Sequence, residues 1–221
     1  MASRSHRVFG VLAATTFLMV AALVGGAIVS HSPHNLLGSP LSASAASGLN
    51  FDNLVFIVME NHNICDILAS CGGTATYMSS LADSWGLAAN DHYCNVNPSL
   101  PNYLCLLGGT DFGCSGYDGD PHSNACTNTA WNSANLVDRL EAGGVTWKAY
   151  MQDMPSNCYG SNSGDYAVRH NPFVYFNSVV SNPDRCARVV PSGSSDSTFL
   201  NDLASPSTTS NFMWLDRKSV V

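Results

Sequence analysis

The apolar positions of this chain change their spacing several times between residues 54 and 215, and each spacing predicts an element. Residues 54–59 form an unbroken apolar run rich in β-branched side chains, which is typical of a strand covered on both faces in a parallel sheet. The same reasoning predicts, in chain order, helix 74–85, strand 87–93, a helix starting near Pro101, helix 133–142, strand 145–151, helix 196–204 and strand 211–215. Alternating strands and helices predict a layered α/β fold, with a mostly parallel sheet between helices.

Apolar stripes on two of these helices are expected to face the core. In helix 74–85 the stripe consists of Tyr77, Met78, Leu81, Ala82 and Trp85. In helix 196–204 it consists of Phe199, Leu200 and Leu203. Ser133 is the expected N-cap of helix 133–142, because its hydroxyl can accept a backbone N–H of the first turn.

The N-terminal segment has the pattern of a secretory signal. Residues 8–29 are almost wholly apolar or small, carry no charge and follow Arg4 and Arg7, while residues 43–45 resemble a cleavage site. The apolar run is also long enough to span a bilayer as an uncleaved anchor. We expect residues 1–30 to be a signal peptide or signal anchor and residues 31–48 a linker or cleaved segment. The remainder would be secreted, with membrane contact only through residues 8–29.

Eight cysteines in 221 residues favour disulfides in an exported domain. Close spacing favours the pairs Cys65–Cys71 and Cys114–Cys126, with Cys158–Cys186 next, although connectivity cannot be deduced from sequence. The alternative is a zinc cluster, which is disfavoured because no Cys-x-x-Cys or His-x-x-x-His spacing accompanies the cysteines. The formal net charge of -7 and the lack of a Lys/Arg cluster argue against nucleic acid as a partner.

Candidate chemistry lies in two stretches. The strand predicted at 54–59 ends in Glu60, Asn61 and His62, and ligand crevices of open α/β sheets lie beyond the carboxyl ends of strands. The alternative is that these residues only begin a polar loop. Ser99 lies just before Pro101 and an apolar run, so we expect it at a helix N-terminus, where free N–H groups favour an anion. The alternative is an ordinary N-cap serine.

Three motifs together resemble the phosphoesterase family, which holds secreted bacterial acid phosphatases and phospholipases C within the alkaline-phosphatase-like superfamily. The first two are residues 57–62 and 98–103; the third, residues 147–155 followed by 166–173, is similar to the acid-phosphatase branch. The resemblance runs from about residue 53 to residue 215, and the matching order of the motifs makes it specific. It implies an alkaline-phosphatase-like fold.

The resemblance also implies roles for individual residues. Glu60 and Asn61 match a metal-binding pair, which with Ser99 would hold a divalent metal cation of unknown identity. Ser99 matches the hydroxyl nucleophile that takes the phosphoryl group, and a metal or a base would activate it. Asn102 matches a polar residue beside the nucleophile. The dipeptide Arg169-His170 matches a basic pair near the phosphate, which makes Arg169 a substrate-binding candidate. His170 and Asn102 are candidates for both catalysis and substrate binding.

The chain departs from the family pattern in two places. Asn97 stands where the family usually has a histidine, and an amide cannot act as an acid or a cation. The family's later ligand-bearing segments have no counterpart, and residues 216–221 resemble the translation of a common sequencing adapter. We therefore expect residues 49–215 to be the N-terminal part of a phosphoesterase domain and residues 216–221 a non-native tail. The sheet should then be incomplete on its C-terminal side, with an exposed edge beside residues 211–215.

The predicted function is hydrolysis of phosphoric ester bonds, most like that of an exported, metal-dependent acid phosphatase that acts on small phosphomonoesters through a serine nucleophile. One alternative is a phospholipase C-type phosphodiesterase with a phospholipid substrate. Another is a secreted, disulfide-rich binding module or an inactive relative. Because a catalytic metal needs several ligands in defined geometry, we expect the 221-residue chain itself to be inactive.

Overall fold

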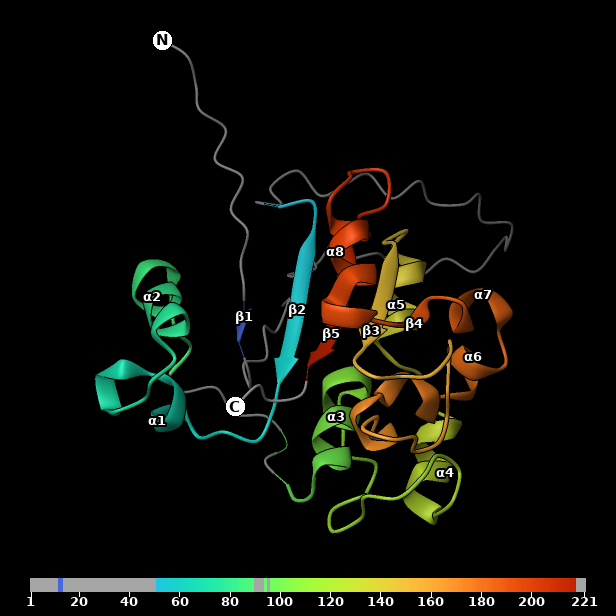
Figure 1. The fold of residues 1–221 in the computed structure, drawn as a ribbon. Coiled ribbons are helices and arrows are strands. Elements are labelled where there is room, and N and C mark those ends of the chain that lie inside the picture. Colours follow the sequence, from blue (N-terminus) through green and yellow to red (C-terminus); the bar gives the residue numbers. More distant parts are fainter. Residues whose placement is uncertain (1–11, 14–50, 90–93, 95, 218–221) are drawn as a thin grey trace, which may run out of the picture.

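A computed structural model of the protein describes residues 12–13, 51–89, 94 and 96–217. Within these residues one parallel sheet has the strand order β1-β2-β5-β3-β4, with helices on both faces (Figure 1). The strands are β1 (Leu12–Ala13), β2 (Leu54–Met59), β3 (Trp147–Met151), β4 (Val189–Pro191) and β5 (Phe212–Arg217). The predicted layered α/β fold with a parallel sheet is confirmed.

Short helices make up most of the remaining regular structure. The α-helices are α1 (Ile64–Ile67), α2 (Thr76–Trp85), α3 (Ser99–Gly108), α4 (Ala125–Trp131), α5 (Leu136–Ala142), α6 (Asn177–Val180), α7 (Pro183–Cys186) and α8 (Ser197–Leu203). The 3-10 helices are η1 (Ala69–Cys71), η2 (Val168–His170), η3 (Pro172–Tyr175) and η4 (Ser194–Asp196). None of the helices in the described ranges is long and apolar enough to cross a membrane.

β5 lies in the middle of the sheet, although it is the last strand in the sequence. Trp214 of β5 pairs with Phe56 of β2 on one side and with Ala149 of β3 on the other. The expectation of an exposed edge beside residues 211–215 is therefore wrong. Parallel strands are joined by long crossovers, so a late strand can insert between two earlier ones.

Two apolar layers hold the helices on the sheet. On one face Phe173 of η3 stacks on Trp147 at a centroid distance of 5.5 Å and meets Trp214 edge-on at 5.4 Å, alongside residues of α3 and α5. On the other face Phe199 of α8 packs edge-on against Tyr150 at 5.3 Å. Burying each such large side chain contributes about 1.5–3 kcal/mol, so these aromatics fix which helices cover each face.

Helix α2 forms where predicted, but its apolar stripe is not core. Tyr77 is 71% and Trp85 69% exposed, so the expected burial of this stripe is wrong. The buried side chain of α2 is Ser79, whose hydroxyl accepts the N–H of Ala69 at 2.9 Å. Figure 1 shows α1 and α2 beside β1, away from the helices that cover the sheet faces. Helical spacing identified side chains that share a face, but not what that face meets.

Other local predictions also need correction. Residues 87–89 form no strand, and residues 90–93 of that expected strand lie outside the described residues. Asn135 rather than Ser133 caps α5, because its side chain accepts the Val137 N–H at 2.9 Å. Leu200 is 54% exposed, so it does not share the buried side of α8. The expected signal, linker and tail mostly fall outside the described residues, apart from β1 and residues 216–217.

Disulfides tie together all eight cysteines. The three favoured pairs, Cys65–Cys71, Cys114–Cys126 and Cys158–Cys186, are present. The fourth, Cys94–Cys105, was not predicted and joins the segment before Ser99 to the buried side of α3. It therefore closes a loop that contains the candidate nucleophile.

Candidate active site

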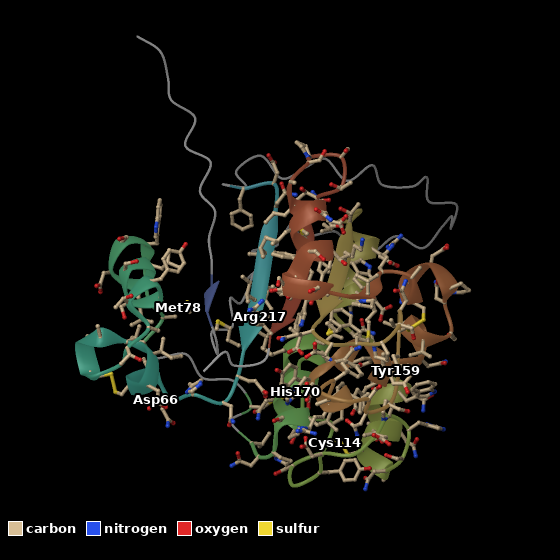
Figure 2. All side chains as sticks on the ribbon, in the orientation of Figure 1. Asp66, Met78, Cys114, Tyr159, His170 and Arg217 are labelled. Carbon is tan, nitrogen blue, oxygen red and sulfur yellow. A yellow bond between two sulfur atoms is a disulfide. The ribbon has the colours of Figure 1, made fainter. Side chains whose placement is uncertain are left out.

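Glu60 and His170 come from different sequence motifs and meet at the end of β2. Glu60 directly follows β2, and its Oε2 atom lies 2.9 Å from Nε2 of His170 in η2. His170 is buried, and its Nδ1 atom has no hydrogen-bond partner within the described part of the chain. Figure 2 shows His170 between the end of β2 and helix α3. The contact brings the first and third motifs into one site.

Helix α3 links this pair to Ser99. Ser99 is the half-buried first residue of α3, as predicted, and Tyr103 lies one turn later on the same helix face. The Tyr103 ring stacks on the His170 ring with centroids 5.0 Å apart and an interplanar angle of 22°. Ser99 therefore lies on the face of α3 that meets His170.

Asn102 secures the segment that leads into α3. Its Nδ2 atom donates to the carbonyl oxygens of Val96 at 2.5 Å and Pro98 at 3.1 Å, and its Oδ1 atom accepts the Val96 N–H at 3.2 Å. Asn97, in the same segment, is exposed, and its carbonyl accepts the Gly116 N–H at 2.7 Å. Asn102 thus holds the backbone before Ser99, while its contact with substrate stays a prediction.

Arg169 reaches the start of α3 through Asp118. The Oδ1 atom of Asp118 accepts the N–H of Leu100, the second residue of α3, at 2.9 Å. The Oδ2 atom of the same carboxylate lies 3.1 Å from Nε of Arg169. A single carboxylate therefore connects the basic dipeptide to the first turn of the helix that carries Ser99.

A left-handed backbone conformation recurs just beyond three strands. Asn61 follows β2 with φ of 67°, and Asp153 follows β3 with φ of 59°. After β4, Ser195 and Asp196 have φ of 51° and 59°. Non-glycine residues rarely adopt this conformation, and such strain concentrates at functional sites. The carboxyl edge of the sheet therefore combines unusual backbone conformations with the candidate polar side chains. Asn61 itself is exposed beside Glu60.

Hydrogen bonds to neutral side chains hold the residues around η2. The buried Asn171 donates to Oη of Tyr166 at 2.9 Å, and that hydroxyl donates to the Tyr159 carbonyl at 2.8 Å. Burial raises the pKa of Tyr166, so its hydroxyl stays neutral across the ordinary pH range. This arrangement fixes the backbone next to His170 without adding charge.

The carboxylate of Asp216 also lies at this edge. Tyr103 donates its hydroxyl to Oδ1 of Asp216 at 3.0 Å, and Asp216 is buried near the end of β5. Asp216 belongs to the segment 216–221 that the sequence assigned to a non-native tail, and residues 216–217 of that segment complete β5.

Comparison with known proteins places most of the chain in one family. Residues 71–204 match the model of the Phosphoesterase family, which is more than half of the 221-residue chain. The chain belongs to the phosphoesterase family. The matched region of this phosphoesterase contains Ser99, Asn102, Arg169 and His170, whereas Glu60 and Asn61 lie just before it. No solved structure matches the chain significantly.

Named phosphatases are among the relatives of this phosphoesterase. A phosphatidylinositol-3-phosphatase of Mycobacterium tuberculosis is 31% identical over 180 residues, covering 80% of this chain and 51% of the relative. A phosphate-repressible acid phosphatase of Penicillium chrysogenum is 28% identical over 166 residues, covering 72% of this chain and 36% of the relative. The chain therefore spans about half or less of the length of these relatives.

The predicted metal site of the phosphoesterase is short of donors in the described residues. Glu60, Asn61 and Ser99 offer oxygen atoms of the kind that Mg²⁺, Ca²⁺ and Mn²⁺ prefer. However, the Glu60 carboxylate is already paired with His170, and no three His, Cys, Asp or Glu side chains in the described ranges gather as a metal site. These donors do not fit a metal centre by themselves, so we derive no step through a cation.

Two residues of this site were missed by sequence reasoning, Asp118 and Tyr103. Tyr103 lies inside the second motif, and its helical spacing from Ser99 was a usable signal. Asp118 stands in a polar, glycine-rich loop that resembles any other surface loop, so its contacts with Leu100 and Arg169 have no local sequence signal.

Proposed function

We propose that this protein hydrolyses phosphoric monoesters, with Ser99 as the nucleophile. The observation that carries the proposal is the meeting of Glu60 and His170 at 2.9 Å beside the face of α3 that bears Ser99. A purely structural contact would not need to lie beside the helix face that carries a candidate nucleophile, at the carboxyl edge of the sheet. Membership of the phosphoesterase family and phosphatase-named relatives support the same reaction class.

The proposed reaction has two displacements at phosphorus. The Ser99 oxygen attacks the phosphoryl group, its proton leaves, and the bond from phosphorus to the leaving alcohol breaks while that alcohol takes up a proton. Water then attacks phosphoserine and releases inorganic phosphate. The N-terminus of α3, with roughly half a positive charge, and the Arg169 guanidinium would stabilise the phosphoryl oxygens. Glu60 and His170 are the neighbouring groups that can exchange protons.

The relative from Mycobacterium tuberculosis favours one class of monoester. Its name describes removal of phosphate from a phosphoinositide, which is a lipid phosphomonoester. We therefore infer that the substrate of this protein is a phosphomonoester, either soluble or lipid, rather than the phosphodiester that a phospholipase C cleaves. Comparing hydrolysis of p-nitrophenyl phosphate, phosphatidylinositol 3-phosphate and phosphatidylcholine separates these substrates. Release of diacylglycerol from phosphatidylcholine as the fastest reaction would contradict the monoester proposal.

Export belongs to the same proposal. The four disulfides of the described residues are typical of proteins that fold in oxidising compartments, and they support the secretory pattern of the N-terminus. Fractionation of the expressing cell tests this prediction. Recovery of the protein in the cytoplasm with reduced cysteines would contradict it.

The decisive experiment replaces Ser99 with alanine. Ser99→Ala should lower phosphomonoester turnover more than about a hundredfold, because the proposed phosphoenzyme forms on the Ser99 hydroxyl. Ser197→Ala is the matched control, since Ser197 also begins a helix but lies on α8 at the opposite face of the sheet. Its rate should stay within about twofold. Rates are compared in the 221-residue chain and in any longer natural form of the protein, because the chain spans about half or less of the relatives' length.

A modest effect would refute the assignment. If Ser99→Ala keeps more than roughly a tenth of the parent rate, the loss is under about 1.4 kcal/mol and Ser99 is not the nucleophile. Circular dichroism of both variants shows whether α3 and the sheet remain folded. Trapping phosphoserine by acid quench in the parent supplies a second, independent readout.

A further inference from the structure

The loop around Asp118 contacts two parts of the proposed site with one carboxylate. Its Oδ1 atom accepts the Leu100 N–H at 2.9 Å, and its Oδ2 atom lies 3.1 Å from Nε of Arg169. Both oxygens are therefore engaged, one with the first turn of α3 and the other with the basic dipeptide. The loop thereby connects the second and third sequence motifs, which are far apart in the sequence.

Other bonds hold this loop in place independently of Asp118. The disulfide Cys114–Cys126 closes its base, and the Gly116 N–H donates to the Asn97 carbonyl at 2.7 Å. Tyr175, buried in η3, donates its hydroxyl to the Gly119 carbonyl at 2.8 Å. The backbone around Asp118 should therefore persist when its side chain is changed, so the contribution of the carboxylate can be tested by itself.

The guanidinium of Arg169 is bound on one side only. Its Nε atom faces Asp118, while Nη1 and Nη2 have no hydrogen-bond or ion-pair partner among the described residues. A guanidinium is a planar fork that recognises phosphate oxygens through two parallel N–H groups, and this requires a fixed plane. An anionic partner beside Nε restricts how the guanidinium can turn and leaves its outer edge available.

We propose that Asp118 is a positioning residue that holds Arg169 beside the first turn of α3, with its outer edge presented to a phosphoryl group at Ser99. The inference rests on the proposed function and extends it by naming the residue that orients the phosphate-binding arginine. Asp118 acts through Arg169 and does not touch the substrate. The negative charge of the Asp118 carboxylate is matched by Arg169 and by the N–H at the start of α3. Phosphate can therefore bind without displacing this carboxylate.

The substitution Asp118→Asn isolates the charge. The amide oxygen can still accept the Leu100 N–H, but the ionic contact with Arg169 is lost. We expect the dissociation constant for inorganic phosphate, measured by calorimetry on the full chain, to rise about five- to tenfold, because the guanidinium loses its fixed orientation. In a form of the protein that turns over a phosphomonoester, KM should rise by a similar factor while kcat changes less than about threefold.

Two comparisons separate positioning from a general effect of charge or folding. Asp120→Asn is the matched control, because Asp120 lies in the same loop and its carboxylate accepts a hydrogen bond from Asn162, with no hydrogen bond or ion pair to α3 or Arg169 among the described residues; phosphate affinity should stay within about twofold. The double variant Asp118→Asn/Arg169→Lys should bind phosphate no more weakly than Arg169→Lys, since both changes remove the same contact. Asp118→Glu, which keeps the charge, should recover part of the affinity.

The possible failures are distinguishable. If the parent protein neither binds phosphate nor hydrolyses a phosphomonoester, the proposed function fails, and the positioning role fails with it. If the parent binds phosphate and Asp118→Asn binds it equally well, only the positioning role is overturned. Tighter binding by Asp118→Asn would also overturn it, because the carboxylate would then be competing with phosphate for the helix start. Additive losses in the double variant would mean that Asp118 acts without Arg169.

Discussion

Removing the disulfide between Cys94 and Cys105 should weaken both the fold and the proposed site. The bridge spans a sequence separation of 11, and Cys105 is buried in α3. In the chain-entropy model a loop of this length contributes about 3 kcal/mol to the free energy of unfolding. Loss of the buried sulfur of Cys105 adds about 1 kcal/mol. The double variant Cys94→Ala/Cys105→Ala should therefore be about 4 kcal/mol less stable, or about 8–16 °C lower in Tm.

The matched control is Cys65→Ala/Cys71→Ala. This bridge spans a separation of 6 between exposed residues, so its loss should cost only about 2 kcal/mol. Urea denaturation of both variants, with the other disulfides intact, gives the two free energies. Phosphate binding should fall only in the first variant, because only its loop contains Ser99. Equal destabilisation of the two variants, or unchanged phosphate binding in both, would refute this reasoning.

Three further outcomes are expected. Glu60→Gln should lower phosphomonoester turnover more than about tenfold, because the proposed site loses the carboxylate that contacts His170; a rate within about twofold of the parent would remove Glu60 from that site. Arg185→Ala should lower the free energy of unfolding by about 2 kcal/mol, because the guanidinium binds the carboxylates of Glu141 and Asp138 on α5. Arg139→Ala is the control, and it should change the free energy of unfolding by under about 0.5 kcal/mol because Arg139 is exposed. Burial raises the pKa of Glu141, but hydrogen bonds from Trp147 and Arg185 outweigh it and hold that pKa below its usual range. The resulting stability is present above the pKa of the unfolded chain and is lost as pH falls through the folded-state pKa. The difference in urea midpoint between the parent and Glu141→Gln should therefore shrink in acid, and a constant difference would contradict this.

Element type was predictable where one local signal dominated. The apolar run at 54–59 specifies a strand, because a strand covered on both faces of a parallel sheet needs a continuous apolar run. The strand predicted at 145–151 forms as Trp147–Met151. β4 was missed because Val189–Pro191 is too short to show a period. The cap of α5 was misplaced by two residues, since Ser133 and Asn135 are both good capping types and only the backbone decides between them.

Burial was harder to predict than secondary structure. Tyr77 and Trp85 share a face of α2 as their spacing requires, but spacing says nothing about which surface lies opposite. The prediction that β5 borders an exposed edge failed for a related reason. Strand order depends on pairing between segments that are far apart in the sequence, such as Phe56 of β2 with Trp214 of β5. No short stretch of sequence contains this information.

The site could be predicted in outline because parallel topology constrains it. Parallel strands end at one edge, so a polar tip after β2 had to lie near residues that follow the other strands. The i, i+4 relation between Ser99 and Tyr103 then carries the argument further. Because Tyr103 stacks on His170, and His170 contacts Glu60, the helix face that bears Ser99 must turn toward the end of β2. A rotation of α3 that moved Ser99 away would break the stacking, so the orientation of the candidate nucleophile depends on an aromatic contact one turn further along its own helix.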